Sequence, residues 1–425
     1  MHNLLARPGP ELAAVLDAVL AALAKAVPIP AGHRKDLPPA VRELSSLLTA
    51  ERGGLSRSYW SAPRLASAYL YFFLPWNIFR LAWLLPGLDL SLRQGSRILD
   101  LGSGPLTLPI ALWCARPDLR QTPLSFDCVD VAAKPMQYGR SVFYALAGED
   151  SPWRMSLVRS PVEKALRLAE KEQGGYACII AGNVLNELFT GGGSARQRPP
   201  GFLAGSLADS LSDSLADRME ELTDLAHSAL LPEGRLFLLE PGNRFGGKLI
   251  ALARESALGQ GFAVLSPCTH EADCPMLEHS WCHFTLPAAG APQALRELSA
   301  KARLEKNSLA LSCLLLRRGI AARTTASTIS GVSEIPGASE ARIRVISAPI
   351  RLPGSVEPAR YACCSRGLAL LPNALRTPSG AFVSMPWPDK EQRDAKSGAL
   401  MLKRTTLPDT RSTASNPRAR DSRKA

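Results

Sequence analysis

The chain has 425 residues, of which 46% are hydrophobic, and a formal net charge of +12 at pH 7. So much apolar surface excludes a disordered chain and is enough to build at least one large core. The positive charge favours an acidic partner, because clustered lysines and arginines neutralise phosphate groups. The 9 cysteines, an odd number, favour a reducing compartment over a disulfide framework.

Two apolar stretches near the N-terminus, residues 12–27 and 65–88, have the length of export or membrane segments. Charged residues interrupt the first stretch, and no small-residue cleavage site follows it. The second carries Pro75, Asn77 and Arg80 near its middle, and each of these is costly in lipid. We therefore expect a cytoplasmic, bacterial-type protein with neither a signal peptide nor a membrane partner.

The chain changes its hydrophobic pattern near residue 93. Residues 1–92 repeat apolar side chains at the helical period, which predicts a helical N-terminal unit. Residues 93–318 alternate short apolar runs with helical stretches, which predicts a parallel sheet with helices on both faces. The expected strands are Arg97–Leu101, Ser125–Val129, Met155–Val158, Ala177–Ala181, Arg235–Leu239, Phe262–Leu265 and Leu309–Leu316.

The remaining segments are distinguished by composition. Residues 191–217, rich in glycine, proline and serine, predict a flexible insertion that leads into a helix and lies over the pocket as a lid. Residues 319–341 have the composition of a linker. Residues 342–371 predict a small β unit, and the polar, basic residues 372–425 predict a mostly disordered tail. The strands expected in the β unit are Arg344–Leu352 and Arg360–Leu371.

A buried strand leads directly into a glycine turn at Arg97–Pro105, and a helix follows. Gly102 and Gly104 let the backbone approach a ligand at the carboxyl end of the strand, where open α/β sheets bind ligands. The next strand ends at Asp130, whose carboxylate suits two ribose hydroxyls. We therefore predict a site for S-adenosylmethionine. The expected binding residues are Asp100, Gly102, Ser103, Gly104, Asp130 and Asn183.

Nicotinamide dinucleotides are the main alternative ligand, because they also bind at a glycine turn followed by a distal acid. Thr107 stands where their fingerprint has a third small residue, and Asp130 comes later than the usual roughly 20 residues. Both features favour the methyl donor. The other alternative is that Gly102 and Gly104 only form a tight turn, with Asp100 as its cap.

The expected fourth strand is followed by Asn183-Val184-Leu185-Asn186-Glu187. A methyl-transfer fold presents polar groups to both substrates at this place, so Asn183, Asn186 and Glu187 are candidate catalytic residues. The Asp/Asn-Pro-Pro-aromatic run of amino-methylating enzymes is absent, and methylation of an exocyclic amine is therefore not supported. Alternatively, the asparagines cap a turn and Glu187 starts a helix.

Cys268, Cys274 and Cys282 share a short segment with three of the chain's 6 histidines. Turn-forming residues fill this segment, so its backbone can wrap around an ion or a cluster. The cysteine spacings are longer than the Cys-x2-4-Cys knuckle of zinc sites, which favours a [4Fe-4S] cluster over zinc. Unligated thiols are the third interpretation. The candidates for a fourth ligand are Cys313, Cys363 and Cys364.

Together these features resemble the bacterial and mitochondrial small-ribosomal-subunit methyltransferase-like family over about residues 55–399. The most specific segments are Leu99–Pro105, Asn183–Leu188, Glu240–Gly242, Cys268–Phe284 and Lys396–Ala399. The resemblance implies an α/β, Rossmann-like core of S-adenosylmethionine-dependent methyltransferases. It adds a helical N-terminal unit, a cysteine-rich metal insertion at residues 266–284 and a small C-terminal β unit.

The resemblance also implies a ligand set and a partner. It places a [4Fe-4S] cluster on Cys268, Cys274, Cys282 and the cysteine of a Tyr-x-Cys segment, which is Cys363 here, with the adjacent Cys364 as the alternative. The implied partner is ribosomal RNA of the small subunit, and no DNA. The functions expected from the resemblance are methylation of this RNA and a role in subunit assembly or translation, and a non-catalytic assembly factor with an iron-sulfur cluster is the alternative. Methylation of a small molecule, with the net charge incidental, is a further alternative that does not depend on the resemblance.

Overall fold

The computed structural model has no helix in its described part that is long and apolar enough to cross a bilayer. Residues 191–205, the larger part of the expected lid, lie outside the described residues. The described ranges are 3–49, 59–172, 174–190, 206–277, 280–319 and 340–402.

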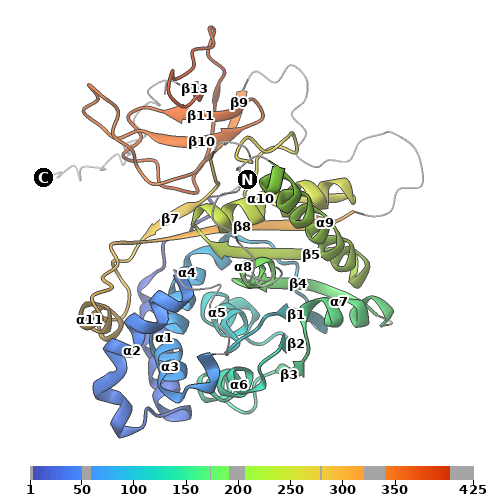
Figure 1. Cartoon of the computed structure of the whole chain (residues 1–425), viewed down its shortest axis with the longest axis vertical. Helices are drawn as coiled ribbons and strands as arrows, with labels where there is room; N and C mark the ends of the chain where they lie inside the picture. The colour runs from blue at the N-terminus through green and yellow to red at the C-terminus, as the bar shows by residue number, and fades with distance from the viewer. Residues whose placement is uncertain are drawn as a thin grey trace, which may run out of the picture.

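The centre of the molecule is an eight-stranded sheet in the order β3-β2-β1-β4-β5-β8-β6, with β7 also paired to β8 (Figure 1). Strands β1 to β5 are parallel, and β8 is antiparallel to β5, β6 and β7. The order 3-2-1-4-5 is that of doubly wound dinucleotide-binding sheets, so the predicted Rossmann-like α/β core is confirmed. The strands are β1 Ser96–Leu101, β2 Leu124–Asp130, β3 Trp153–Arg159, β4 Tyr176–Gly182, β5 Leu230–Pro241, β6 Phe262–Ser266, β7 Phe284–Pro287 and β8 Ser308–Arg318.

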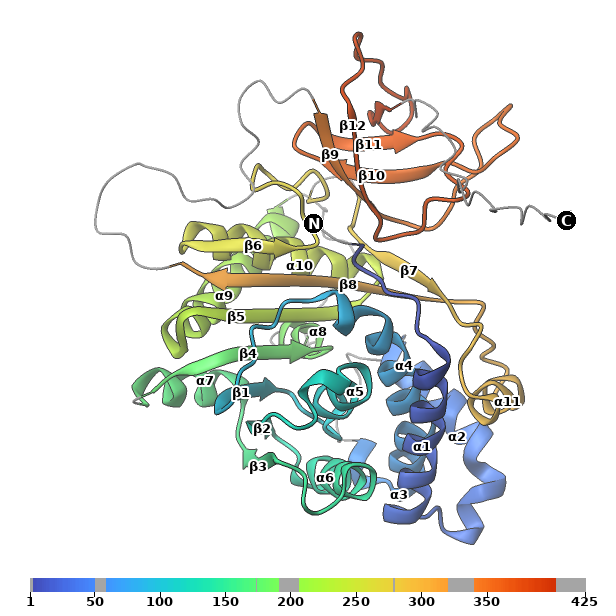
Figure 2. The ribbon, with the colours of Figure 1, turned by 180° about the vertical axis from the view of Figure 1, so that it is seen from behind.

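Helices cover both faces of this sheet. Successive side chains of a strand point to opposite faces, and accordingly Ile98 belongs to the core beneath α5 and α6, whereas Leu99 belongs to the core beneath α7, α9 and α10. Figures 1 and 2 show these two helical layers on either side of the strands. The helices after β1 are α5 Thr107–Ala115, α6 Ala133–Ala147, α7 Val162–Lys171, α8 Leu185–Thr190, α9 Ser206–Ala229, α10 Arg244–Gly259 and α11 Gln293–Lys301.

The N-terminal helices share the core of the first face. Nearly every side chain of α4 is buried, and α4 packs against α5 while α1 packs against α6. A helix that is apolar on all sides must be enclosed by other elements, which explains why the stretch around residues 65–88 is so hydrophobic. The N-terminal elements are α1 Pro10–Ala26, α2 Ala31–Thr49, α3 Pro63–Ala68, a π-helical turn Tyr69–Phe73 and α4 Leu74–Leu84.

A second sheet follows in the order β12-β9-β10-β11-β13 and lies beyond the β6 and β7 edge of the first sheet (Figures 1 and 2). The sequence pattern predicts that this unit ends at residue 371 and that a tail follows it. The structure instead continues the sheet to residue 402, because the polar stretch contains short apolar segments whose side chains, such as Leu400, are fully buried. The strands are β9 Glu340–Val345, β10 Arg360–Cys364, β11 Gly367–Leu371, β12 Phe382–Pro386 and β13 Leu400–Met401.

Two further differences concern the strands of this unit. The single strand expected at Arg360–Leu371 is a hairpin, since β10 and β11 pair antiparallel around Ser365 and Arg366. The strand expected at Arg344–Leu352 ends at Val345, where the next residues join the core instead: Ser347 N donates to His283 O at 2.9 Å. A tight turn and a junction with the core both depend on contacts that alternation alone does not reveal.

Candidate functional site

A cavity of about 920 Å³ opens at the carboxyl ends of β1, β2, β4 and β5, between the sheet and the N-terminal helices. Open α/β sheets bind their ligands at this edge, where the chain connections change direction between β1 and β4. Every residue predicted to bind the donor or to take part in catalysis lines this one cavity. They are Asp100, Gly102, Ser103, Gly104, Asp130, Asn183, Asn186 and Glu187.

The glycine turn after β1 has the backbone conformation that the sequence predicts. Gly102 and Gly104 have φ angles of +64° and +50°, a region that side chains disfavour. A Cβ at Gly102 would meet Val184 Cγ2 at 2.4 Å, so the turn also packs directly on the segment after β4. The two loops that carry the predicted residues are therefore in contact.

Asp130 joins the ends of β1 and β2. Its Oδ2 accepts a hydrogen bond from Gly104 N at 2.9 Å, and its Oδ1 accepts one from Ala132 N at 2.8 Å. Burial raises the pKa of this carboxyl, and these backbone donors oppose the shift. Each carboxylate oxygen retains acceptor capacity, so Asp130 can both brace the turn and accept hydroxyl hydrogens from a ligand.

Asp100 lies beneath the turn and is 1% exposed. Ser103 Oγ donates to Asp100 Oδ2 at 2.7 Å. Burial raises the pKa of Asp100 to about 7, with a further contribution from the charge of Asp130, while the Ser103 hydrogen bond opposes the shift. Asp100 thus acts as an internal support of the turn, at the floor of the cavity.

Two buried charges hold the segment after β4. Arg80 Nη2 from α4 donates to Asn183 Oδ1 at 2.9 Å. Glu240, at the end of β5, accepts from Leu185 N and from Asn186 Nδ2, each at 2.8 Å. Burial raises the pKa of Glu240 to about 7, while these donors and the Arg80 charge oppose the shift. The amides of the two asparagines are therefore oriented by opposite charges at either end of the segment.

The aromatic wall of the cavity was not predicted from the sequence. Tyr59, Trp60 and Tyr69 line the side formed by the N-terminal helices, and the rings of Tyr59 and Tyr69 stack at 5.6 Å. Burial raises the pKa of Tyr69 far above its usual range, and the charges of Glu187 and Asp130 add to this effect. The signal that could have located this wall is the pair Asn77 and Arg80, two polar residues within a helix that is otherwise apolar.

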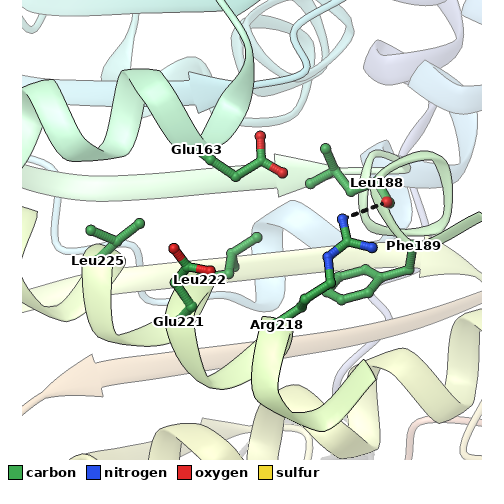
Figure 3. A pocket seen from close by; sticks show the side chains of 7 residues that line it. All are labelled: Glu163, Leu188, Phe189, Arg218, Glu221, Leu222 and Leu225. Atoms are coloured by element: carbon green, nitrogen blue, oxygen red, sulfur yellow. Dashed lines mark hydrogen bonds between the residues drawn. The ribbon is translucent and has the colours of Figure 1, made fainter. Parts of the chain in front are cut away.

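A second, much smaller cavity of about 40 Å³ lies against α8 and between α7 and α9 (Figure 3). Arg218 of α9 donates to Leu188 O at 2.9 Å, and its guanidinium lies over the Phe189 ring at 4.9 Å. The space admits only a few water molecules. Its residues anchor the carboxyl end of α8, whose first turn carries Asn186 and Glu187.

The structure brings together the four cysteines that were predicted to bind a cluster. Burial raises the pKa of the Cys282 thiol, and the neighbouring thiols of Cys268, Cys363 and Cys274 add to this shift. His270 Nε2 lies 3.3 Å from Cys363 Sγ, which links the cysteine-rich segment to β10. Within the described residues, no three histidine, cysteine or acidic side chains are arranged to hold a metal ion. The predicted metal insertion is therefore not shown.

The other candidate ligands differ in their surroundings. Cys364 belongs to the core of the C-terminal sheet and its Sγ donates to Gly367 O at 3.3 Å, whereas Cys363 belongs to the main core. Alternation along β10 thus turns the two thiols to opposite sides. Cys313 on β8 is buried and contributes to raising the pKa of Cys282.

The chain resembles several solved structures at low sequence identity. A methyltransferase dependent on S-adenosylmethionine from Agrobacterium tumefaciens is 16% identical, with a TM-score of 0.32, over 58% of this chain and 62% of that one. The chain therefore spans less than two thirds of that protein. A methyltransferase from Pyrococcus furiosus is 14% identical, with a TM-score of 0.31, over 57% and 83% of the two chains. TrmN from Thermus thermophilus is 20% identical, with a TM-score of 0.28, over 63% and 52%.

No curated protein matches the chain. A family model described as mitochondrial small ribosomal subunit Rsm22 matches residues 209–308. The matched segment runs from α9 to the first residue of β8 and includes Glu240, Cys268, Cys274 and Cys282. Over residues 209–308 the chain thus matches the Rsm22 family of the small ribosomal subunit, which confirms for this segment the resemblance that the sequence predicts.

Proposed function

We propose that the chain binds S-adenosylmethionine in the 920 Å³ cavity and transfers its methyl group to RNA of the small ribosomal subunit. The observation that carries this proposal is the junction of Gly104 N with Asp130 Oδ2 at 2.9 Å, at the switch point of a Rossmann-like sheet. The match of residues 209–308 to a small-subunit family supports the ribosomal partner, as does the formal charge of +12.

The residues of the cavity have distinct tasks in this reaction. Asp130 accepts hydrogen bonds from the ribose hydroxyls, and the glycine turn lets the backbone approach the ligand. When bound, the donor supplies an electrophilic methyl carbon, which an acceptor atom attacks while the sulfur leaves with the electron pair. Asn186 and Glu187 line the same cavity and would help to place the acceptor, because correct placement of the reacting atoms lowers the barrier to methyl transfer.

Replacing Asp130 tests the donor site. Because the carboxylate accepts two hydroxyl hydrogens and an amide accepts fewer, we expect Asp130→Asn to weaken S-adenosylhomocysteine binding at least about tenfold in calorimetry. Purified small subunits incubated with radiolabelled donor should gain label with the unaltered chain and lose it with the variant. Asp118→Asn, a change far from the cavity, is the control. Equal labelling by all three chains would contradict methylation at this site.

A second candidate function is a non-catalytic factor for assembly of the small subunit, held together by an iron-sulfur cluster. The observation that favours it is that Cys363, on β10, lies near Cys268, Cys274 and Cys282 of the cysteine-rich segment. Four cysteine thiolates are the ligand set of a [4Fe-4S] cluster, and these side chains would hold it. Such a cluster would join the C-terminal sheet to the core and contribute folding energy.

Elemental analysis after anaerobic purification tests the cluster. We expect about four iron and four sulfide ions per chain, with zinc near zero. Cys268→Ser should lower the iron content and the thermal stability, whereas Cys364→Ser should leave the iron content unchanged because that thiol faces the other core. Full iron content in Cys268→Ser, or stoichiometric zinc in the unaltered chain, would rule out the proposed ligand set.

A further inference from the structure

Helix α4 places a buried cation beside the donor cavity, and the function proposed above does not use it. Arg80 is 7% exposed and lines the cavity together with Asn77 and Asn183. Its Nη2 donates to Asn183 Oδ1 at 2.9 Å and to Asn77 Oδ1 at 3.1 Å. Its Nη1 donates to Ala310 O at 3.2 Å. One guanidinium therefore joins α4, the end of β4 and the start of β8.

This guanidinium determines which end of the Asn183 amide faces the cavity. An arginine has only donors, so the amide oxygen must face Arg80 and the Nδ2 hydrogens are directed elsewhere. The backbone of Asn183 is fixed as well: its φ is +59°, and its N donates to Leu239 O at 2.7 Å. Asn183 therefore presents hydrogen-bond donors to a molecule in the cavity.

The position of Asn183 in the sheet indicates which part of the donor it meets. Strand β1 lies between β2 and β4, Asp130 ends β2, and Asn183 follows β4. A donor with its ribose at Asp130 crosses the Gly102–Gly104 turn and brings its amino-acid part to Asn183. That part carries a carboxylate, which suits both an N–H donor and a nearby positive charge.

We propose that Arg80 is a positioning residue which, through the amide of Asn183, selects ligands that carry a carboxylate beyond the adenosine. The proposal rests on the proposed function, because it places the ribose of the donor at Asp130. Arg80 acts at a distance through its charge and directly through the Asn183 hydrogen bond, while Glu240 partly balances this charge from the far side of the segment.

Two probes separate this role from a merely structural one. S-adenosylhomocysteine and 5′-methylthioadenosine share the adenosine and the thioether, but only the first has the amino-acid part. We expect the unaltered chain to bind S-adenosylhomocysteine at least about tenfold more tightly in calorimetry, the range expected for a hydrogen bond to a charged group. Arg80→Gln and Asn183→Asp should abolish this preference and change 5′-methylthioadenosine affinity by less than about twofold.

Arg235→Gln is the matched control. Arg235 is also 7% exposed, but it bonds to Asp89 and Glu233 at the opposite end of the sheet, so its variant should keep the full preference. Asn183→Asp retains a partner for Arg80 and remains informative where Arg80→Gln fails to fold. Asp130→Asn should weaken both probes equally, because both contain the ribose.

Each outcome has one meaning. The proposal is supported if Arg80→Gln and Asn183→Asp lose the preference for S-adenosylhomocysteine while Arg235→Gln keeps it. The proposal is overturned, and the donor site is not, if Arg80→Gln and Asn183→Asp weaken the binding of both probes equally. The same holds if these variants keep the preference for S-adenosylhomocysteine. A wild-type chain that binds neither probe overturns the donor site and this inference together.

Discussion

Asp100 illustrates how a single buried carboxyl supports the site at an energetic cost. It is 1% exposed beneath the glycine turn, and burial raises its pKa to about 7. The folded state therefore favours the protonated form. Its contribution to stability is fully present below the unfolded pKa, about 4, and is lost as the pH rises through about 7.

Removing this titration should change how stability depends on pH. We expect the free energy of unfolding of the ligand-free wild-type chain, relative to Asp100→Asn, to fall between pH 5 and pH 8. The fall over this window can reach about 3 kcal/mol, because the raised pKa lies about two pH units above pH 5 and each unit corresponds to about 1.36 kcal/mol. Glu240, which also titrates near pH 7, is present in both chains and cancels. Denaturant unfolding at several pH values measures the difference.

Asp118→Asn is the matched control for this measurement. The Arg116 side chain holds the pKa of Asp118 below its usual range, so the contribution of Asp118 changes only below about pH 4. The difference in the free energy of unfolding between Asp118→Asn and the wild-type chain should therefore stay constant between pH 5 and pH 8. A flat difference for Asp100→Asn as well would show that Asp100 does not titrate in this window.

At the level of elements, the glycine turn depends on a helix that never reaches the cavity. A Cβ at Gly139 in α6 would lie 2.3 Å from Pro105 C and 2.8 Å from Leu106 N. The helix therefore packs directly on the backbone that follows Gly104, and this contact determines how far the turn projects into the cavity.

Gly139→Ala should move the turn without changing any residue of the cavity. Because the added methyl group overpacks a tight contact, we expect a loss of about 1–3 kcal/mol in the free energy of unfolding and weaker binding of S-adenosylhomocysteine. Gly259→Ala is the control, since a Cβ at the end of α10 meets nothing within 4 Å; its stability should be unchanged or slightly higher. Denaturant unfolding measures the stability of both variants, and calorimetry measures their affinity for S-adenosylhomocysteine. Unaltered affinity in a destabilised Gly139→Ala would contradict the link between helix and turn.

For the whole molecule, the end of the second sheet separates a packed part of the chain from a strongly basic part. Leu400 and Leu402 are buried, at 0% and 1% exposure, and β13 pairs parallel to β11. Residues 403–425, which lie outside the described part, contain seven lysines and arginines. The residues up to Leu402 thus contribute buried packing, and the residues that follow carry positive charge.

Two truncations should separate these contributions. A chain that ends at Ala399 loses two buried leucines, and we expect it to unfold at a lower temperature than a chain that ends at Leu402, by the equivalent of about 2–5 kcal/mol per leucine. The chain that ends at Leu402 should bind small subunits with a shallower salt dependence than the full chain, because it neutralises fewer phosphates. Equal unfolding temperatures, or equal salt slopes, would contradict the corresponding half of the prediction.

The sequence by itself determined the Rossmann-like core and several of the residues that line the candidate cavity. Alternating apolar runs fix strands and helices locally, and a glycine turn after a strand has few conformations, so Gly102, Gly104 and Asp130 were predicted to lie together. The cysteine spacing predicts that Cys268, Cys274 and Cys282 share a site with a later cysteine, and the family resemblance selects Cys363 for it. The match of residues 209–308 covers that segment but does not test the roles of its cysteines.

The tertiary structure alone decided what surrounds the site. Arg80 lies 103 residues before Asn183 in the chain, and no local pattern relates them; only the packing of α4 on α5 brings the guanidinium to the end of β4. The aromatic wall of Tyr59 and Tyr69 and the extension of the second sheet to Leu402 have the same origin. Side-chain pairing between distant segments depends on how whole elements pack, whereas period and turn chemistry depend only on neighbouring residues.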